Sequence, residues 1–171
     1  DMLELAIYKI DGPVAVRYPR GGEGEYKQSA GKAPSIVLRE GKDITLVSYG
    51  VMINNMLEAA KMLESAGIDA EVIKLNLINP LDTATVIRSL RKTGRLLTAE
   101  DVCAVGSVGS RLLAVAAEEG IALVAARTLD LGNGIVQHGS VDELIKLFGL
   151  DAESIAETAK GFFAVYDGST D

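Results

Sequence analysis

The sequence has 171 residues, of which 24 are acidic and 17 basic, so its formal net charge is −7. So acidic a chain lacks the positive surface that binds nucleic acid or an anionic membrane, and no apolar run approaches the roughly 20 residues of a membrane helix. Hydrophobic residues make up 48% and exclude disorder. The single Cys103 cannot form an internal disulfide, and with the single His138 it cannot build a Cys/His metal cage, so a reducing, cytoplasmic setting is expected.

The first 34 residues differ in composition from the rest. The apolar spacing predicts a short helix over residues 2–9, and residues 14–18 are typical of a strand. Residues 20–34 are rich in Gly, Glu, Lys and Ser, which is typical of a linker. One helix and one strand are too little for a core of their own, so we expect this part to be the tail of another domain.

From residue 35 onward, strand and helix patterns alternate. Strands are predicted over 35–39, 44–49, 72–77, 96–98 and 122–126, and helices over 51–66, 83–92, 110–119, 141–148 and 152–163. The strands are short apolar runs, which indicates that both faces of the sheet are covered. The alternation predicts a parallel α/β/α sheet with right-handed crossovers, and the hairpin-length turn at 40–43 predicts that the first strand pairs antiparallel at an edge.

The densest polar cluster is segment 17–22, which reads Arg-Tyr-Pro-Arg-Gly-Gly. An arginine fork makes paired hydrogen bonds to a phosphate or a carboxylate, and glycines let the backbone approach such an anion. Arg17 and Arg20 are therefore candidate anion ligands. The alternative, which spacing alone favours, is a solvated strand end with ordinary surface arginines.

Two other segments have both a functional and a structural interpretation. The small residues at 105–110 precede a helix, where amide groups attract anions, but they also suit close packing on the sheet with Ser107 or Ser110 as the cap. Glu100 and Asp101 follow a strand, at the edge of open sheets where ligands bind. They could serve as an acid/base pair, but such a pair more often caps a helix or holds the next loop.

The remaining candidates are expected to be structural. His138 precedes a capping box at Ser140 and Glu143 and has no carboxylate or nucleophile beside it in the sequence, so we expect a loop histidine without a catalytic role. Cys103 lacks an activating neighbour and is expected to be a small buried hydrophobe. The residues alone therefore predict an acidic α/β/α domain without a complete catalytic constellation or metal site.

An ordered set of motifs is nevertheless similar to one known family. Residues 12–21, Gly-Pro-Val-Ala-Val-Arg-Tyr-Pro-Arg-Gly, resemble the end of the pyrimidine-binding domain of the 1-deoxy-D-xylulose-5-phosphate synthases. Residues 40–50 resemble the family's first C-terminal hairpin, and 79–82 its Lys-Pro-Leu-Asp turn. Residues 98–101 and 106–110 resemble its Val-Glu-Glu-Asn and glycine-rich motifs. Residues 138–140 and 149–151 resemble its His-Gly-Ser and its Gly-Leu-Asp. The family's Glu-Glu-Asn reads Ala-Glu-Asp at 99–101 here, and its Pro-Asp reads Gly-Asn at 132–133.

The resemblance implies a domain organisation and a fold. Residues 1–21 would be the tail of the pyrimidine-binding domain, 22–34 a linker, 35–166 a transketolase C-terminal-like domain, and 167–171 a tail. The domain would be a three-layer α/β/α fold with a mostly parallel five-stranded sheet and one antiparallel edge strand.

The resemblance also implies an activity for the longer protein. The family consists of cytoplasmic, homodimeric transferases that use thiamine diphosphate and Mg²⁺ to join decarboxylated pyruvate to D-glyceraldehyde 3-phosphate, for isoprenoid, thiamine and pyridoxal synthesis. Its cofactor and catalytic residues lie upstream, so this chain would hold no catalytic residue and no bound cofactor, and would act structurally against the upstream domains and in the dimer. The second arginine of the family's segment contacts the substrate phosphate, a role that carries over to Arg20 and less directly to Arg17.

The departures keep other interpretations open. The chain could belong to another transketolase-like protein, such as a split subunit, or to a 2-oxo acid dehydrogenase β chain. It could also be a free-standing module that binds a small anion in the strand-end crevice near Glu100 and Gly106. The Arg-Tyr-Pro-Arg-Gly segment favours the synthase among these.

Overall fold

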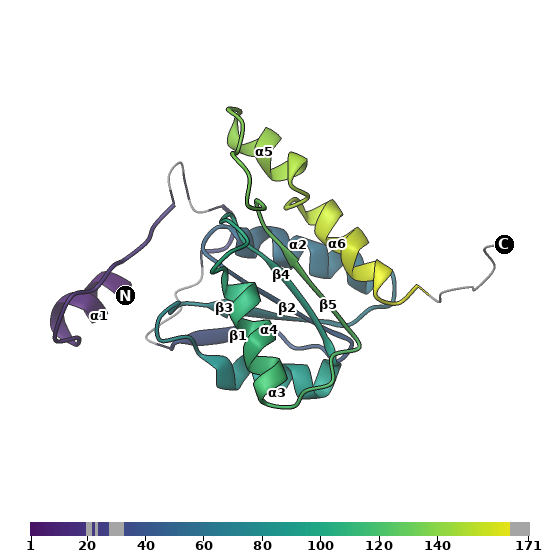
Figure 1. The fold of residues 1–171 in the computed structure, drawn as a ribbon, viewed down its shortest axis with the longest axis horizontal. Helices are drawn as coiled ribbons and strands as arrows, with labels where there is room; N and C mark the ends of the chain where they lie inside the picture. Colours follow the sequence, from purple (N-terminus) through teal and green to yellow (C-terminus); the bar gives the residue numbers. More distant parts are fainter. Residues whose placement is uncertain (20–21, 23, 28–32, 165–171) are drawn as a thin grey trace.

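The computed structural model describes residues 1–19, 22, 24–27 and 33–164, and its centre is one five-stranded sheet with helices on both faces (Figure 1). The strand order is β1-β3-β2-β4-β5. The strands are β1 (Ser35–Arg39), β2 (Ile44–Tyr49), β3 (Ala70–Leu75), β4 (Arg95–Ala99) and β5 (Ala125–Leu129). The helices are α1 (Met2–Tyr8), α2 (Met52–Ser65), α3 (Thr83–Thr93), α4 (Val108–Glu118), α5 (Val141–Leu147) and α6 (Ala152–Gly161).

The predicted fold class is confirmed. β1 pairs antiparallel with β3 at one edge, whereas β3, β2, β4 and β5 pair parallel with their neighbours. Parallel neighbours need crossover connections, and here helices provide them on both faces of the sheet. In the part of the chain that the structure describes, no helix is long and apolar enough to cross a membrane.

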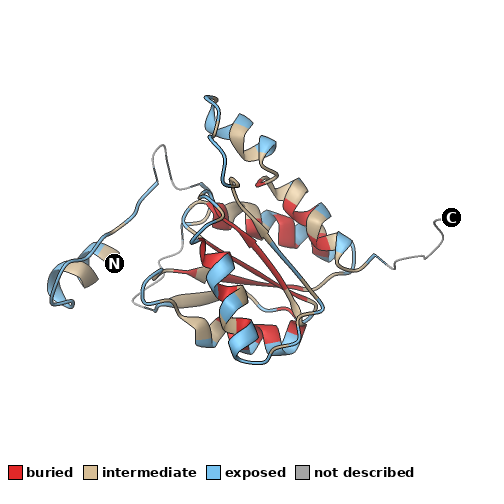
Figure 2. Cartoon of the chain, viewed as in Figure 1, coloured by how far each residue is buried: buried red, intermediate tan, exposed pale blue. Residues whose placement is uncertain are grey.

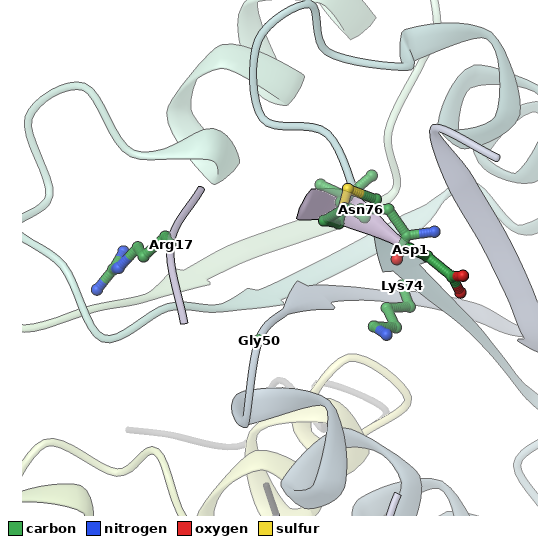
Figure 3. Close-up of a pocket in the computed structure, with 7 residues that line it drawn as sticks. Asp1, Arg17, Gly50, Lys74 and Asn76 are labelled. Carbon is green, nitrogen blue, oxygen red and sulfur yellow. The ribbon is translucent and has the colours of Figure 1, made fainter. Parts of the chain in front are cut away.

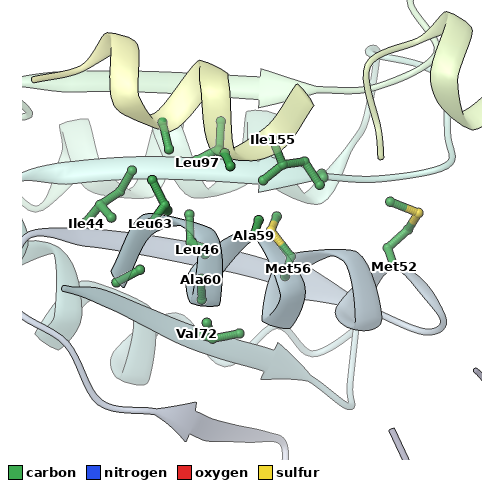
Figure 4. Close-up of a cluster of buried hydrophobic side chains, with 14 of the residues drawn as sticks. Ile44, Leu46, Met52, Met56, Ala59, Ala60, Leu63, Val72, Leu97 and Ile155 are labelled. Atoms are coloured by element: carbon green, nitrogen blue, oxygen red, sulfur yellow. The ribbon is translucent and has the colours of Figure 1, made fainter. Parts of the chain in front are cut away.

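Two hydrophobic cores lie on opposite faces of the sheet (Figure 2). The first fills the space between the sheet and helices α2 and α6, where Leu46, Met56 and Leu97 are fully buried (Figure 4). The second lies under α3 and α4 and includes Val47 and Leu96. Successive strand residues point to opposite faces, so a strand covered on both faces reads as a continuous apolar run.

Local signals begin and end the helices that carry these cores. α3 begins after Asp82, whose Oδ1 accepts a hydrogen bond from the amide of Thr85 at 3.3 Å. It ends at Gly94, whose φ of 63° is the left-handed conformation that suits glycine. α5 begins at the predicted capping box, in which Ser140 and Glu143 bond to each other's backbone amides.

The first strand pairs antiparallel at an edge of the sheet, as predicted, but its partner is β3, so the hairpin-length turn at 40–43 does not join two paired strands. β3 lies between β1 and β2, and the loop over residues 40–43 crosses the amino end of β3 instead of turning back beside β1. The amides of Lys42 and Asp43 both donate to the carbonyl of Asp69, at 3.0 and 2.9 Å. Arg39 fixes the end of β1 to the same place, because its Nη1 donates to the carbonyl of Ala70 at 2.5 Å.

The predicted strand over 14–18 is wrong, because residues 13–19 adopt neither helix nor strand. A strand needs a neighbour to hydrogen-bond, and none of the described strands lies beside this segment. α1 is formed as predicted, but none of its residues is buried, and it stands away from the sheet in Figure 1. α1 therefore belongs to neither hydrophobic core of the sheet domain.

We expect Gly41→Ala to lower the free energy of unfolding by about 3 kcal/mol, because a Cβ at this position would lie less than 3.0 Å from the backbone of Ala70 and Glu71. The backbone of Ala70 and Glu71 cannot move away without breaking the contacts by which the loop over residues 40–43 crosses the amino end of β3. Gly161→Ala is the matched control, since a Cβ there meets nothing within 4 Å and alanine favours the helix. Urea denaturation should show the control no less stable than the parent; equal loss in both variants would contradict this account.

Candidate functional site

The polar residues gather where β2, β3 and β4 end, at the carboxyl edge of the sheet. β2 lies between β3 and β4, and the loops after β2 and β4 lead to helices on opposite faces. The strand order therefore reverses at this point, which is where open α/β sheets bind ligands. Tyr49, Glu100 and Asp101 all lie at this edge, as the positions of the last two in the sequence indicated.

Glu100 is buried, and donors of the chain itself satisfy its carboxylate oxygens by hydrogen bonds. Its side chain accepts from the amides of Val108 and Gly109, at 2.8 and 2.6 Å, and from the Tyr49 hydroxyl at 3.1 Å. The first amide groups of a helix have no partner within the helix and carry partial positive charge. Glu100 thus caps α4, the structural role that the sequence favoured, and this occupancy counts against an external anion at the same helix start.

The glycine at 109 allows this close approach. A Cβ on Gly109 would lie less than 3.0 Å from side-chain atoms of Thr98 and Thr128, so any larger residue would push α4 away from β4 and β5. Ser107 provides a second cap by accepting from the amide of Ser110 at 3.1 Å. The small residues at 105–110 therefore serve close packing on the sheet, which confirms the structural interpretation of that segment.

Burial raises the pKa of the Tyr49 hydroxyl well above its usual value, and the neighbouring charge of Glu100 and its hydrogen bond to the hydroxyl raise it further. The positive charge of Arg17 acts in the opposite direction on the same group. Tyr49 consequently stays protonated and donates to Glu100 at any physiological pH. Tyr49 was not singled out in the sequence, although its position at the last residue of a strand was a usable signal.

Arg17 reaches the same edge of the sheet from outside the domain. Its Nη2 lies 3.5 Å from Oδ1 of Asp101, and both side chains are substantially exposed, 64% and 44%. The residue that sequence reasoning named as a candidate anion ligand is thus already paired with a carboxylate. Arg20, the stronger candidate, lies outside the described residues.

A cavity of about 290 Å³ adjoins this pair (Figure 3). Asp1, Arg17, Lys74 and Asn76 are among the residues that line it, and the guanidinium of Arg17 points away from the other three in Figure 3. Burial lowers the pKa of the Lys74 ammonium, which also lies 4.6 Å from the centre of the Tyr26 ring. Met2 and Leu75 also line the cavity, and the patterns in the sequence pointed to neither Lys74 nor Asn76.

Two further residues can now be placed. Cys103 is exposed and donates to the carbonyl of Val105 at 3.4 Å, so the expectation of a buried residue is wrong. It belongs to the loop between β4 and α4, which extends past the end of the sheet core. His138 is exposed in the loop before α5, as its sequence context indicated. Within the described ranges, no group of three or more His, Cys, Asp or Glu residues could hold a metal ion.

Known proteins resemble this chain in sequence. A family described as "Transketolase, C-terminal domain" matches residues 33–155. The 1-deoxy-D-xylulose-5-phosphate synthase of Heliobacterium modesticaldum is 38% identical over 164 residues, which cover 93% of this chain and 25% of that protein. The synthase of Chlorobium phaeovibrioides is 37% identical over 170 residues, 95% of this chain and 26% of that protein. The chain thus spans about a quarter of the length of these curated relatives.

Solved structures agree on the fold. A split-gene transketolase, described as an inactive β4 tetramer, superimposes with a TM-score of 0.66 at 30% identity, covering 84% of this chain and 45% of that one. A transketolase of Pichia stipitis superimposes with a TM-score of 0.55 over 79% of this chain and 18% of that one. At 23% identity, this second likeness bears on the fold alone.

We expect Glu100→Ala to lower the free energy of unfolding by about 3 kcal/mol, because it leaves the buried amides of Val108 and Gly109 without an acceptor. Glu100→Gln keeps an acceptor but loses the charge at the helix start, so its loss should be smaller, about 1 to 2 kcal/mol. Glu118→Ala, an exposed change on the same helix, should stay within about 0.5 kcal/mol. Urea denaturation that ranks the three variants otherwise would refute the capping role.

Proposed function

Because this chain belongs to the transketolase C-terminal domain family, we propose that it is the carboxyl-terminal part of a 1-deoxy-D-xylulose-5-phosphate synthase. One observation carries the choice of this synthase within the family. The two curated synthases match 93% and 95% of the chain. The family match begins at residue 33, and residues 33–171 alone make up a smaller share of the chain than that. The similarity therefore reaches into the first 32 residues, where the Arg-Tyr-Pro-Arg-Gly segment lies.

The proposed reaction joins the two-carbon unit left after decarboxylation of pyruvate to D-glyceraldehyde 3-phosphate, giving 1-deoxy-D-xylulose 5-phosphate and carbon dioxide. In this proposal the longer protein is a cytoplasmic homodimer that uses thiamine diphosphate and Mg²⁺, and the thiazolium ring of the cofactor supplies the electron sink. We propose that upstream domains bind the cofactor and the metal ion, since the described residues of this chain hold no group of three or more His, Cys, Asp or Glu side chains that could bind a metal.

The contribution of this chain to the reaction is substrate binding and support. Arg20 would contact the phosphate of the substrate through charge-assisted hydrogen bonds. Arg17 is the weaker phosphate ligand, because the carboxylate of Asp101 competes for its guanidinium. Residues 35–166 would form the C-terminal domain, 22–34 the linker and 167–171 a tail.

Residues 1–21 would belong to the preceding pyrimidine-binding domain. Exposed apolar side chains support this division, since Leu3, Ile7 and Tyr8 of α1 are 63%, 68% and 74% exposed. A short helix with an uncovered apolar side fits a contact with another domain. The residues of the chain thus suit a packing role against upstream domains and in the dimer.

We expect the longer protein that contains this chain to form 1-deoxy-D-xylulose 5-phosphate from pyruvate and D-glyceraldehyde 3-phosphate with thiamine diphosphate and Mg²⁺, and the 171-residue chain alone to form none. Mass spectrometry of the products would measure both. Turnover by the chain alone would refute the supporting role. A longer protein that accepts a ketose phosphate donor but not pyruvate would instead identify a transketolase.

In the longer protein, Arg20→Ala should raise the KM for D-glyceraldehyde 3-phosphate about 10- to 100-fold, the effect of losing hydrogen bonds between a guanidinium and a phosphate. The KM for pyruvate should stay unchanged. Arg91→Ala is the control, because Arg91 pairs with Glu119 on the surface of the C-terminal domain. An equal effect with unphosphorylated glyceraldehyde as the acceptor would show that Arg20 does not bind the phosphate.

A further inference from the structure

We propose that residues 24–27 form a strap that is bound to the sheet domain through the side chain of Tyr26. The composition of residues 20–34 predicts a linker, and Tyr26 is the one aromatic residue in that stretch. Because this residue is bound, the strap moves with the sheet domain and does not act as a free connection. The strap does not depend on the proposed function, since every contact that holds it lies within the described part of the chain.

Tyr26 supplies both an apolar contact and a hydrogen bond. Its side chain is partly buried and packs against the hydrophobic core between the sheet and helices α2 and α6. Its amide donates to Oδ1 of Asn54, a residue of α2, at 2.7 Å. A segment without regular structure loses conformational entropy when it is held in one position, and the burial of the ring together with this hydrogen bond offsets the loss.

The ammonium of Lys74, on β3, makes a further contact with the strap. Its Nζ lies 4.6 Å from the centre of the Tyr26 ring, which is within the range of a cation–π interaction. Burial lowers the pKa of this ammonium, and a partly desolvated cation gains more from an aromatic ring than an exposed cation does. Tyr26 is therefore held by residues of two elements, α2 and β3.

Gly24 lets the strap lie close to α2. Its φ of 73° is in the left-handed region that suits glycine. A Cβ at this position would lie 2.5 to 2.9 Å from side-chain atoms of Asn54, the residue that accepts the hydrogen bond from the amide of Tyr26. The same asparagine thus meets the strap at residues 24 and 26, which fixes how the strap lies along α2.

The strap restricts where the part of the chain that precedes it can lie. A flexible connection allows two parts of a chain many relative positions, and their range falls as the connection becomes shorter. With residues 24–27 held against α2 and β3, the position of the preceding segment depends on the sheet domain. The surface that accepts Tyr26 is thus a docking surface for the chain's own connection.

Amide hydrogen exchange of the 171-residue chain, followed by NMR, tests the strap. The amide of residue 26 should exchange at least about tenfold more slowly than in an unstructured peptide, because it is hydrogen-bonded. Tyr26→Ala should remove most of this protection, since it removes the buried ring. Tyr26→Phe should keep it, because the hydroxyl that it removes is buried and has no hydrogen-bond partner among the described residues.

Asn54→Ala should lower the protection of amide 26 about tenfold, since it removes the acceptor of the hydrogen bond. The matched control is Asn55→Ala, because Asn55 donates instead to the carbonyl of Leu150. Amides of β2 should stay protected in each variant, which shows that the sheet domain remains folded. Three results would each overturn the strap: an unprotected amide 26 in the parent chain, equal protection in Tyr26→Ala and Tyr26→Phe, or an equal loss in Asn55→Ala and Asn54→Ala.

Discussion

The organisation of this domain depends on the hydrogen bonds that the carboxylate of Glu100 accepts. A buried carboxylate is costly unless hydrogen bonds satisfy it, and here two helix amides and the Tyr49 hydroxyl do so. Through these bonds, one side chain connects the ends of β2 and β4 with the start of α4. These three hydrogen bonds thus fix the geometry of the carboxyl edge of the sheet.

The bound carboxylate of Glu100 alters what the carboxyl edge of the sheet can bind, although ligands commonly bind at such an edge. At such an edge a free helix start would attract an external anion, but here the helix start holds a carboxylate of the chain. The cations nearest to this edge are Arg17, which comes from the segment preceding the domain and pairs with Asp101, and Lys74, which lines the neighbouring cavity.

The sequence predicts the regular part of the fold well, because the apolar patterns and the caps are local signals. α2 has its apolar residues at helical spacing, and Ser140 with Glu143 forms the expected capping box. Strand pairing is not local, so the turn at 40–43 could not reveal that β3 lies between the two strands that it joins. The sequence predicts residues 14–18 as a strand for the same reason, since the apolar pattern carries no information about a neighbour.

The candidate site was predictable only in part. Glu100 and Asp101 were found from their position after a strand, but adjacent carboxylates give no sign of which is buried. Glu100 became a helix cap and Asp101 an exposed partner of Arg17, although both follow the same strand. Cys103 was misjudged because a cysteine in a loop beyond the strand end has nothing to pack against, whatever its hydrophobicity.

The position of β1 has a consequence for the order in which the domain assembles. β1 precedes β2 and β3 in the chain, yet its hydrogen-bonding partner is β3, which follows a complete strand and helix. During synthesis the first strand therefore emerges long before the edge that receives it. β1 can pair only once β3 has been synthesised, and it then covers an edge of β3 that would otherwise be open to pairing with other chains.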